Sequence, residues 1–384
     1  MKRLLALIVL PLAVWAFGLP AASATPFNAA QVEAAIDAFA EAVLEGRQTP
    51  GLAVAVARAG EPVWVRGYGY ANLEHGVPVG EDTVFRIGSV TKQFTAAAIL
   101  LLAEEGRLSL DDTVEAYFPD FPRAEDITIR QLLQHTAGIS NYTSRDGFMA
   151  DTAPLHHDRE RMLAYIAAAD PLYDFEPGTG WSYSNSGYIL LDYIVEDAAG
   201  QPLADFLREQ IFNPLGLNDT RMDDAAEILA RRAQGYDAAE DAPSGFTNTA
   251  HLSLSVAAGA GAMRSTARDL ALWMQALLDG EVVTPASLAL MLEPARLNDG
   301  SLASSALENP PAALAGMDYG LGIMTGERDG RRFIGHGGSI NGFNASLIHY
   351  PDEATTIVLL VNTIGPAARG APVLAGAVLG EAAE

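Results

Sequence analysis

Ser89 and Lys92 are the residues whose types and spacing most directly indicate chemistry. Residues three apart on a helix share a face, so the serine hydroxyl and the lysine amine would lie within hydrogen-bond reach. A serine hydroxyl is a weak nucleophile until a neighbouring group takes its proton, and a desolvated lysine can take it. The N-terminal end of the helix would also favour negative charge that develops nearby. The plainer interpretation is that Ser89 caps the helix and Lys92 is a solvated charge.

The use of lysine in this chain favours the chemical interpretation. The sequence contains two lysines, Lys2 and Lys92, and its other Lys/Arg positions are all arginine. Arginine supplies charge and hydrogen-bond donors, but it cannot give up its proton in a protein. Apart from Lys2, the chain uses arginine at every other basic position. The lysine at position 92 therefore indicates that an amine with an adjustable pKa is required there.

Tyr183 and Asn185 form a second polar group, in a loop rich in glycine and serine. A tyrosine hydroxyl can relay a proton to a leaving group, and an asparagine side chain can hold a substrate amide. Taken alone, the segment is more typical of an ordinary polar turn with helix-capping residues.

The third group is the segment from His336 to Ser339, in which Gly337 and Gly338 follow a short expected strand. Two glycines permit close approach of the backbone to a ligand. A backbone N–H here could join that of Ser89 in an oxyanion hole. Taken alone, the segment favours a glycine-rich strand end with a buried histidine.

The order of the three groups along the chain resembles the serine β-lactamase and penicillin-binding protein superfamily. In that superfamily a Ser/Lys motif on an early helix is followed by Tyr-x-Asn and then by a basic residue–x–Gly on a late strand. The surrounding segments resemble the class C β-lactamase branch, which also holds D-Ala-D-Ala carboxypeptidases, D-aminopeptidases and esterases. These segments are Phe85–Gly88, Gly106–Asp112, His135–Ile139 and Ser265–Leu270.

The resemblance implies a role for each residue of the site. Ser89 would be acylated, Lys92 would assist its deprotonation, and Tyr183 would carry a proton to the leaving group. The substrate-binding residues would be Asn185, His336, Gly338 and Ser339. His336 would take the place of the basic residue on the sheet edge, and the backbone N–H groups of Ser89 and Ser339 would form the oxyanion hole. Whether Lys92 or Tyr183 is the base in acylation stays open at this point.

The third group departs from the pattern, since a class C β-lactamase usually has Lys-Thr-Gly where this chain has His336-Gly337-Gly338. A histidine is largely neutral above its pKa, which weakens a fixed positive charge for a substrate carboxylate. The resemblance therefore implies a serine hydrolase most similar to a D-Ala-D-Ala carboxypeptidase, with a small peptide, β-lactam or ester as substrate. A β-lactamase or carboxylesterase of the same family is one alternative. A non-catalytic, penicillin-recognising sensor or binding domain is the alternative from a different class.

Hydrophobic periodicity predicts the elements that position these groups. Strands at both chain ends with helices between them indicate an α+β fold, in which both ends form one antiparallel sheet with flanking helices and an inserted helical lobe; the resemblance implies the β-lactamase/transpeptidase-like form of this fold. Expected strands cover residues 52–57, 63–68, 319–324, 332–334, 345–350 and 356–361. Expected helices cover residues 28–46, 93–105, 129–133, 160–168, 188–199, 203–211 and 267–278. The α/β part would take residues 25–105 and 260–384, the helical lobe residues 106–259, and a surface loop residues 302–315.

Residues 1–24 have the features of a secretory signal peptide. Lys2 and Arg3 precede an apolar stretch, and Ala22-Ser23-Ala24 has the small-x-small spacing of a signal-peptidase site. The alternative is an uncleaved membrane anchor. Cleavage would leave a hydrolase of residues 25–384, periplasmic or secreted, with no stable membrane insertion.

Charge and composition exclude several kinds of partner. The formal net charge is −24, and removal of Lys2 and Arg3 leaves 22 basic and 48 acidic residues, near −26. Such a surface repels nucleic acid and anionic lipid, so we expect neither as a partner. The chain has no cysteine, and its seven histidines show no metal-ligand spacing. We therefore expect no metal and no cofactor; the sequence makes no prediction of the oligomeric state.

Overall fold

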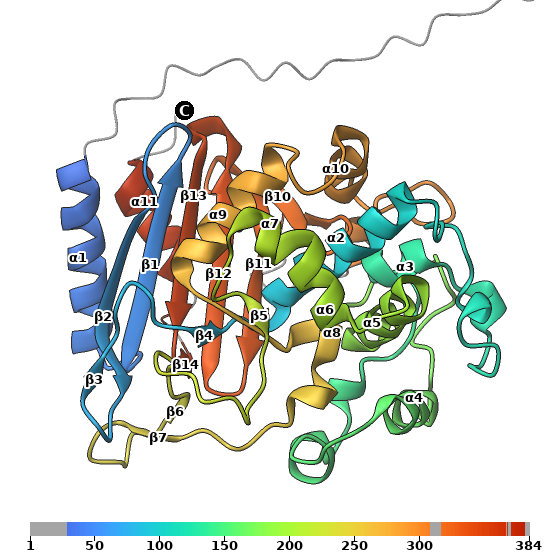
Figure 1. Cartoon of the computed structure of the whole chain (residues 1–384), viewed down its shortest axis with the longest axis horizontal. Coiled ribbons are helices and arrows are strands. Elements are labelled where there is room, and N and C mark those ends of the chain that lie inside the picture. Colours follow the sequence, from blue (N-terminus) through green and yellow to red (C-terminus); the bar gives the residue numbers. More distant parts are fainter. Residues whose placement is uncertain (1–28, 308–315, 366, 368–369, 381–384) are drawn as a thin grey trace, which may run out of the picture.

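The computed structural model describes residues 29–307, 316–365, 367 and 370–380. Its main feature is an eight-stranded antiparallel sheet in the order β3-β2-β1-β13-β12-β11-β10-β9 (Figure 1). The strands are β1 (Gly51–Arg58), β2 (Trp64–Asn72), β3 (Val77–Pro78), β9 (Met317–Tyr319), β10 (Met324–Arg328), β11 (Arg331–Ile340), β12 (Phe343–Tyr350) and β13 (Thr355–Val361). β1 pairs with β13 from Leu52↔Val361 to Arg58↔Thr355, so early and late segments of the chain meet near the middle of the sheet.

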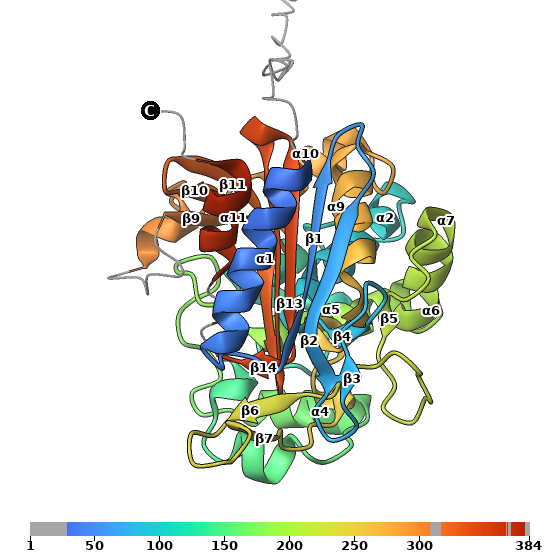
Figure 2. The ribbon, with the colours of Figure 1, turned by 90° about the vertical axis from the view of Figure 1, so that its left-hand side faces the viewer.

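Helices cover both faces of this sheet. They are α1 (Ala29–Glu45), α2 (Thr91–Glu104), α3 (Ile129–Gln134), α4 (Arg159–Ala167), α5 (Asn185–Ala199), α6 (Leu203–Leu207), α7 (Asn213–Leu215), α8 (Ala258–Gly261), α9 (Ala267–Leu278), α10 (Pro285–Leu292) and α11 (Ala371–Leu379). α1 and α11 pack together on one face, and α9 packs on the other against β1 and β13 (Figures 1 and 2). None of the described helices has the length and apolar character needed to cross a membrane.

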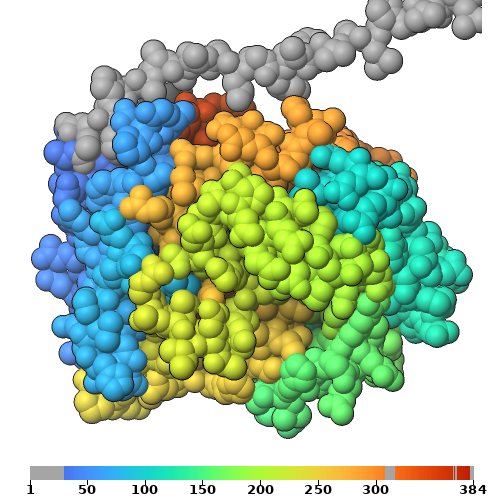
Figure 3. Space-filling view, viewed as in Figure 1, coloured from blue at the N-terminus to red at the C-terminus, as the bar shows by residue number. Residues whose placement is uncertain are grey.

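Most of the remaining helices gather on one side of the sheet, to the right in Figure 1. Of these, α3 to α7 come from residues 106–259, the part of the chain in which the sequence predicts an inserted helical lobe. Segments that follow α5 cover the middle of the face shown in Figure 3, in yellow-green. The arrangement agrees with the predicted α+β fold, while the exact division into two parts stays a prediction.

β1 shows how the sheet separates two cores. Alternate residues of a strand point to opposite faces. Leu52 and Val54 belong to the core that includes α1 and α11. Ala53 and Ala55 belong to the larger core that includes α2 and α9. All four side chains are almost completely buried, so the uniformly apolar run predicted as a strand is a strand covered on both faces.

Three expected elements need correction. The strand predicted at 319–324 is wrong, because β9 ends at Tyr319 and β10 begins at Met324, and these two residues pair with each other. The chain must reverse between them, at a turn that contains two glycines. The helix predicted at 203–211 is wrong in its second half, because α6 ends at Leu207 and a π-helical turn continues to Phe212. The strand expected at 332–334 is longer, because β11 stays paired with β12 as far as Ile340.

Two expectations fall wholly or partly outside the described residues. The signal peptide predicted at residues 1–24 is one, and it stays a prediction. The loop predicted at 302–315 is the other, since residues 308–315 are not described. Within its described part, Ala303–Ala306 form a 3₁₀ turn.

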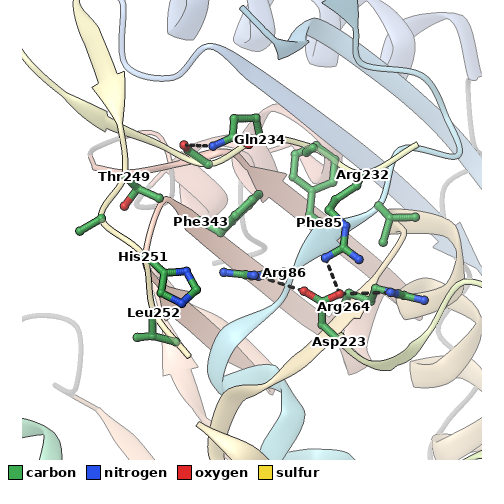
Figure 4. Close-up of a pocket in the computed structure, with 14 residues that line it drawn as sticks. Phe85, Arg86, Asp223, Arg232, Gln234, Thr249, His251, Leu252, Arg264 and Phe343 are labelled. Carbon is green, nitrogen blue, oxygen red and sulfur yellow. Dashed lines mark hydrogen bonds and ion pairs between the residues drawn. The ribbon is translucent and has the colours of Figure 1, made fainter. Parts of the chain in front are cut away.

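Two small sheets complete the fold, in the orders β4-β8-β5 and β14-β6-β7. Their strands are β4 (Phe85–Arg86), β5 (Arg221–Met222), β6 (Tyr236–Ala238), β7 (Phe246–Asn248), β8 (Met263–Ser265) and β14 (Thr363–Ile364). In the first sheet Arg86 lies directly opposite Arg264, and like charges in such cross-strand positions repel. Asp223 lies between the two arginines and accepts hydrogen bonds from both, at 3.0 and 3.1 Å, and from Arg232 at 2.7 Å (Figure 4). Its side chain is 1% exposed, so one buried carboxylate holds three guanidinium groups.

Replacement of Asp223 by asparagine should strongly destabilise the fold. The variant keeps the shape of the side chain but leaves three arginines without their shared counter-charge, which should cost about 3 kcal/mol of the free energy of unfolding. Urea denaturation of Asp223→Asn measures this loss. The matched control is Asp224→Asn at the neighbouring exposed position, which should change stability by less than about 0.5 kcal/mol. Equal effects of the two variants would contradict the role given to Asp223.

Candidate active site

Ser89 lies in the 3₁₀ turn Gly88–Val90, between β4 and α2. It therefore precedes the long helix, which begins at Thr91. The Thr91 hydroxyl donates a hydrogen bond of 2.7 Å to the Gly88 carbonyl oxygen and closes the turn. Gly88 has φ +51°, and a Cβ atom there would lie 2.7 Å from the Ser339 nitrogen. Both the conformation and the contact require a glycine immediately before Ser89.

β11 runs directly against this turn. A Cβ atom added to Gly338 would lie 1.9 Å from the Ile87 carbonyl oxygen and 3.0 Å from the Ser89 nitrogen. The backbones of Ser89 and Ser339, the predicted oxyanion-hole pair, therefore lie next to each other. β10 pairs with β11 only as far as Gly335, and Ser339 is exposed. The structure thus leaves an accessible stretch of β11 beside the serine.

Lys92 is completely buried, and its amine makes three polar contacts. The distance from Nζ is 2.7 Å to the Ala260 carbonyl oxygen, 2.8 Å to Asn185 Oδ1 and 3.2 Å to Ser89 Oγ. Burial holds the pKa of Lys92 well below its usual value, which favours the neutral amine. A neutral amine has two N–H donors and one lone pair. In that form, with both donors on the two carbonyl oxygens, the lone pair would face the Ser89 hydroxyl; a charged amine would instead donate to Ser89 Oγ.

Asn185 is the first residue of α5, and its polar groups are all engaged. Its backbone N–H donates to Asn141 Oδ1 at 3.1 Å, and its Nδ2 donates to Thr143 Oγ1 at 3.1 Å. These bonds orient the side-chain carbonyl toward Lys92. The sequence predicts that Asn185 holds the substrate, whereas the structure places its carbonyl oxygen on the lysine amine.

The Tyr183 hydroxyl is buried close to the Ser89 side chain. It has no hydrogen-bond partner of normal geometry among the described residues. Burial raises the pKa of Tyr183, and the nearby Ser89 side chain offsets only part of this effect. Tyr183 is therefore a neutral phenol whose proton is available to a group that enters the site.

His336 lies on β11 and is buried, 1% exposed. Its Nε2 lies 2.9 Å from the Tyr319 hydroxyl, and its Nδ1 contacts the Gly337 carbonyl oxygen. Burial lowers the pKa of His336 to about 3. The histidine occupies the position expected for it on the sheet, but it carries no positive charge at neutral pH.

His135 is a buried neighbour of these residues that sequence reasoning did not assign to the site. Its ring centroid lies 4.3 Å from that of Tyr183, 4.6 Å from Tyr319 and 5.2 Å from Tyr188. Its Nδ1 accepts a hydrogen bond of 3.2 Å from the Ser184 backbone N–H. Burial lowers the pKa of His135 well below its usual value. The only sequence signal was its place in a segment that supports the family resemblance.

Comparison with known proteins agrees with this geometry. The family model described as Beta-lactamase matches residues 36–379, which is most of the chain. The chain belongs to the beta-lactamase family. Penicillin-binding protein 4* of Bacillus subtilis (strain 168) is 31% identical over 325 residues, which cover 80% of this chain and 67% of that protein. Esterase EstB of Burkholderia gladioli is 37% identical over 211 residues, covering 51% of this chain and 53% of the esterase.

Solved structures of the beta-lactamase family share the fold. A D-amino acid amidase from Ochrobactrum anthropi SV3 matches with a TM-score of 0.78 and 27% identity, covering 91% of this chain and 98% of the amidase. The matched part of the chain spans about two thirds of penicillin-binding protein 4* and about half of the esterase. Family membership makes this protein a serine hydrolase of the β-lactamase and penicillin-binding protein superfamily.

The described residues include no cluster of three or more His, Asp or Glu side chains able to hold a metal ion. A half-buried hydroxyl faces a buried amine whose pKa is lowered by desolvation, with a phenol and adjacent backbone N–H groups beside it.

Substitution of Gly338 by alanine should push β11 away from Ser89. The added methyl group cannot occupy a space 1.9 Å from the Ile87 oxygen, and forced displacement of packed backbone costs roughly 1–3 kcal/mol. Thermal denaturation should therefore show a lower midpoint for Gly338→Ala. The control is Gly337→Ala on the same strand, where the nearest atom to the new methyl is 3.8 Å away. A Gly338→Ala variant as stable as Gly337→Ala would disprove the close approach.

Proposed function

We infer that this protein hydrolyses amides or esters through an acyl-enzyme on Ser89, with Lys92 as the base that takes the serine proton. The observation that carries this proposal is the set of three contacts of the lysine amine. Two carbonyl oxygens use up its donors and leave its lone pair for the serine. A buried, uncharged lysine can accept a proton at neutral pH, which an ordinary solvated lysine cannot.

The remaining groups complete the acyl transfer. Ser89 Oγ bonds to the substrate carbonyl carbon as its proton passes to Lys92. The backbone N–H groups of Ser89 and Ser339 hold the oxyanion. Tyr183 gives its proton to the leaving amine or alcohol and regains a proton from Lys92, a role that a neutral phenol can fill and a phenolate base cannot. Water then attacks the acyl carbon and gives one proton to Lys92. When the bond to Ser89 Oγ breaks, that proton returns to the serine and a carboxylic acid is released.

Two residues of β11 bear on which substrate the site accepts. His336 carries no charge and Gly337 has no side chain. A substrate that ends in a carboxylate would find neither a cation nor a hydroxyl from these two residues, so its charge would be poorly compensated. We therefore favour donors with an uncharged group at this position, such as D-amino-acid amides and esters. The likeness to a D-amino acid amidase, solved with D-phenylalanine, supports this class. The likeness to an esterase supports an oxygen ester as a second donor.

The D-Ala-D-Ala carboxypeptidase activity expected from the sequence stays a prediction, and so does export to the periplasm or the medium. The similarity to penicillin-binding protein 4* supports the first. The composition of residues 1–24 supports the second.

Substitution of Lys92 by arginine should slow acylation by at least about 10²-fold, because arginine keeps the charge but cannot accept a proton. Intact mass after brief exposure to a penicillin or an activated ester measures acylation. Lys92→Met supplies a second variant of similar length that needs no hydrogen bonds when buried. Ser89→Ala is the control that should gain no mass. Acylation of either Lys92 variant at the unaltered rate would rule out lysine as the base.

The substrate class can be tested with a pair of peptides that differ in one group. N-acetyl-D-Ala-D-Ala has a free carboxylate, and its C-terminal amide has none. We expect kcat/KM for the amide to be at least as high as for the acid, since the site offers no cation. A tenfold preference for the acid would instead establish the carboxypeptidase. Failure to cleave either peptide, or the amide and ester of D-phenylalanine, would contradict the proposed activity.

A further inference from the structure

A cavity separate from the active-site residues lies next to β4, and the Arg86 side chain forms part of its lining. It has a volume of about 230 Å³, which is room for roughly eight water molecules at about 30 Å³ each. Its walls come from β4, β8, the start of β12 and the segments around β5 to β7 (Figure 4). Its lining includes none of the residues predicted for the active site.

The cavity is positively charged in a strongly acidic protein. Arg86, Arg232 and Arg264 line it, with Asp223 as the one acidic residue of the lining. The second guanidinium nitrogen of Arg264 pairs with Glu227 at 2.6 Å. Two carboxylates thus compensate three arginines, which leaves one positive charge for a monoanion.

Arg86 is the arginine with hydrogen-bonding capacity to spare. Both terminal nitrogens of Arg232 already donate hydrogen bonds. One donates to Asp223, and the other donates to the backbone carbonyl oxygens of Asp224 and Glu227. Arg86 donates to Asp223 through Nε alone. Its two terminal nitrogens have no acceptor among the described residues. Figure 4 shows this guanidinium between Asp223 and the His251 imidazole, where it presents a planar fork suited to a carboxylate.

Part of the remaining lining is apolar. Phe343 and Leu252 line the cavity and are both largely buried. Phe85 packs edge-on against Phe343, with ring centroids 6.4 Å apart, and fixes its orientation. Most of the exposed lining is polar, so these side chains form a small apolar patch within a largely polar site.

We propose that this cavity is a binding site for a small organic carboxylate with an apolar body. The carboxylate accepts hydrogen bonds from the two terminal nitrogens of Arg86, and the apolar body packs against Phe343 and Leu252. One unpaired positive charge matches one carboxylate. The negative charge of the whole protein disfavours polyanions.

Benzoate is a suitable probe, because it combines a carboxylate with a flat apolar ring. Calorimetric titration should show saturable binding to the unaltered protein and equal affinity for Ser89→Ala, since Ser89 does not line the cavity. Affinity for Arg86→Gln should fall about tenfold or more, the usual effect of losing a charge-assisted pair of hydrogen bonds. The matched control is Arg231→Gln, which removes the same charge from a residue that pairs with Asp82 and Asp219 and does not line the cavity. Its affinity for benzoate should not change.

A comparison of ligands tests the proposal without any variant of the cavity. Benzamide has the shape of benzoate but no charge, and it should bind at least about tenfold more weakly. Equal binding of benzamide, equal binding to Arg86→Gln, or no benzoate binding would each overturn the proposal. Tighter binding of inorganic phosphate than of benzoate would overturn the assignment to an apolar carboxylate.

Discussion

The burial of one amine constrains the arrangement of three helices. Lys92 on α2 has to find oxygen partners in a place that water does not reach, since an unpaired polar group there would be costly. α5 supplies the Asn185 oxygen and α8 supplies the Ala260 oxygen. α8 is itself held by Asp192, which accepts a hydrogen bond of 2.7 Å from the Gly259 backbone N–H. The helices of this region therefore converge on the lysine, and its lone pair is directed at the serine.

The sheet provides the other half of the site through contacts of its backbone. β1 and β13 join early and late segments of the chain, so β11 is carried to a fixed position beside the turn that holds Ser89. Glycines at 88 and 338 let the two backbones come closer than any side chain would permit. The site therefore depends on these two glycines, which have no side chain, as much as on the groups that react.

The sequence predicted the parts of this site that depend on local spacing. Ser89 and Lys92 are three residues apart, so a helical conformation brings them together. The bond between Lys92 and Asn185 spans 93 positions, and nothing in either segment encodes it. The Ala260 oxygen belongs to a backbone group, which leaves no mark on residue type. The same limit applies to the cluster around Asp223, because β4, β5 and β8 are far apart in the sequence and meet only in the folded protein. It also applies to the turn at Gly320, which separates β9 from β10, two strands that the sequence predicted as one.

Burial shifts each of the reacting groups described above toward its neutral form, because it lowers the pKa of Lys92 and His336 and raises that of Tyr183. Dissolved ions act on exposed and charged groups, and buried neutral ones are almost unaffected. The acidic exterior responds strongly to ionic strength, whereas the proton transfers beneath it should proceed at nearly the same rate in dilute buffer and in brine. The fold thereby separates the part of the protein that meets changing salt concentrations from the part that makes and breaks bonds.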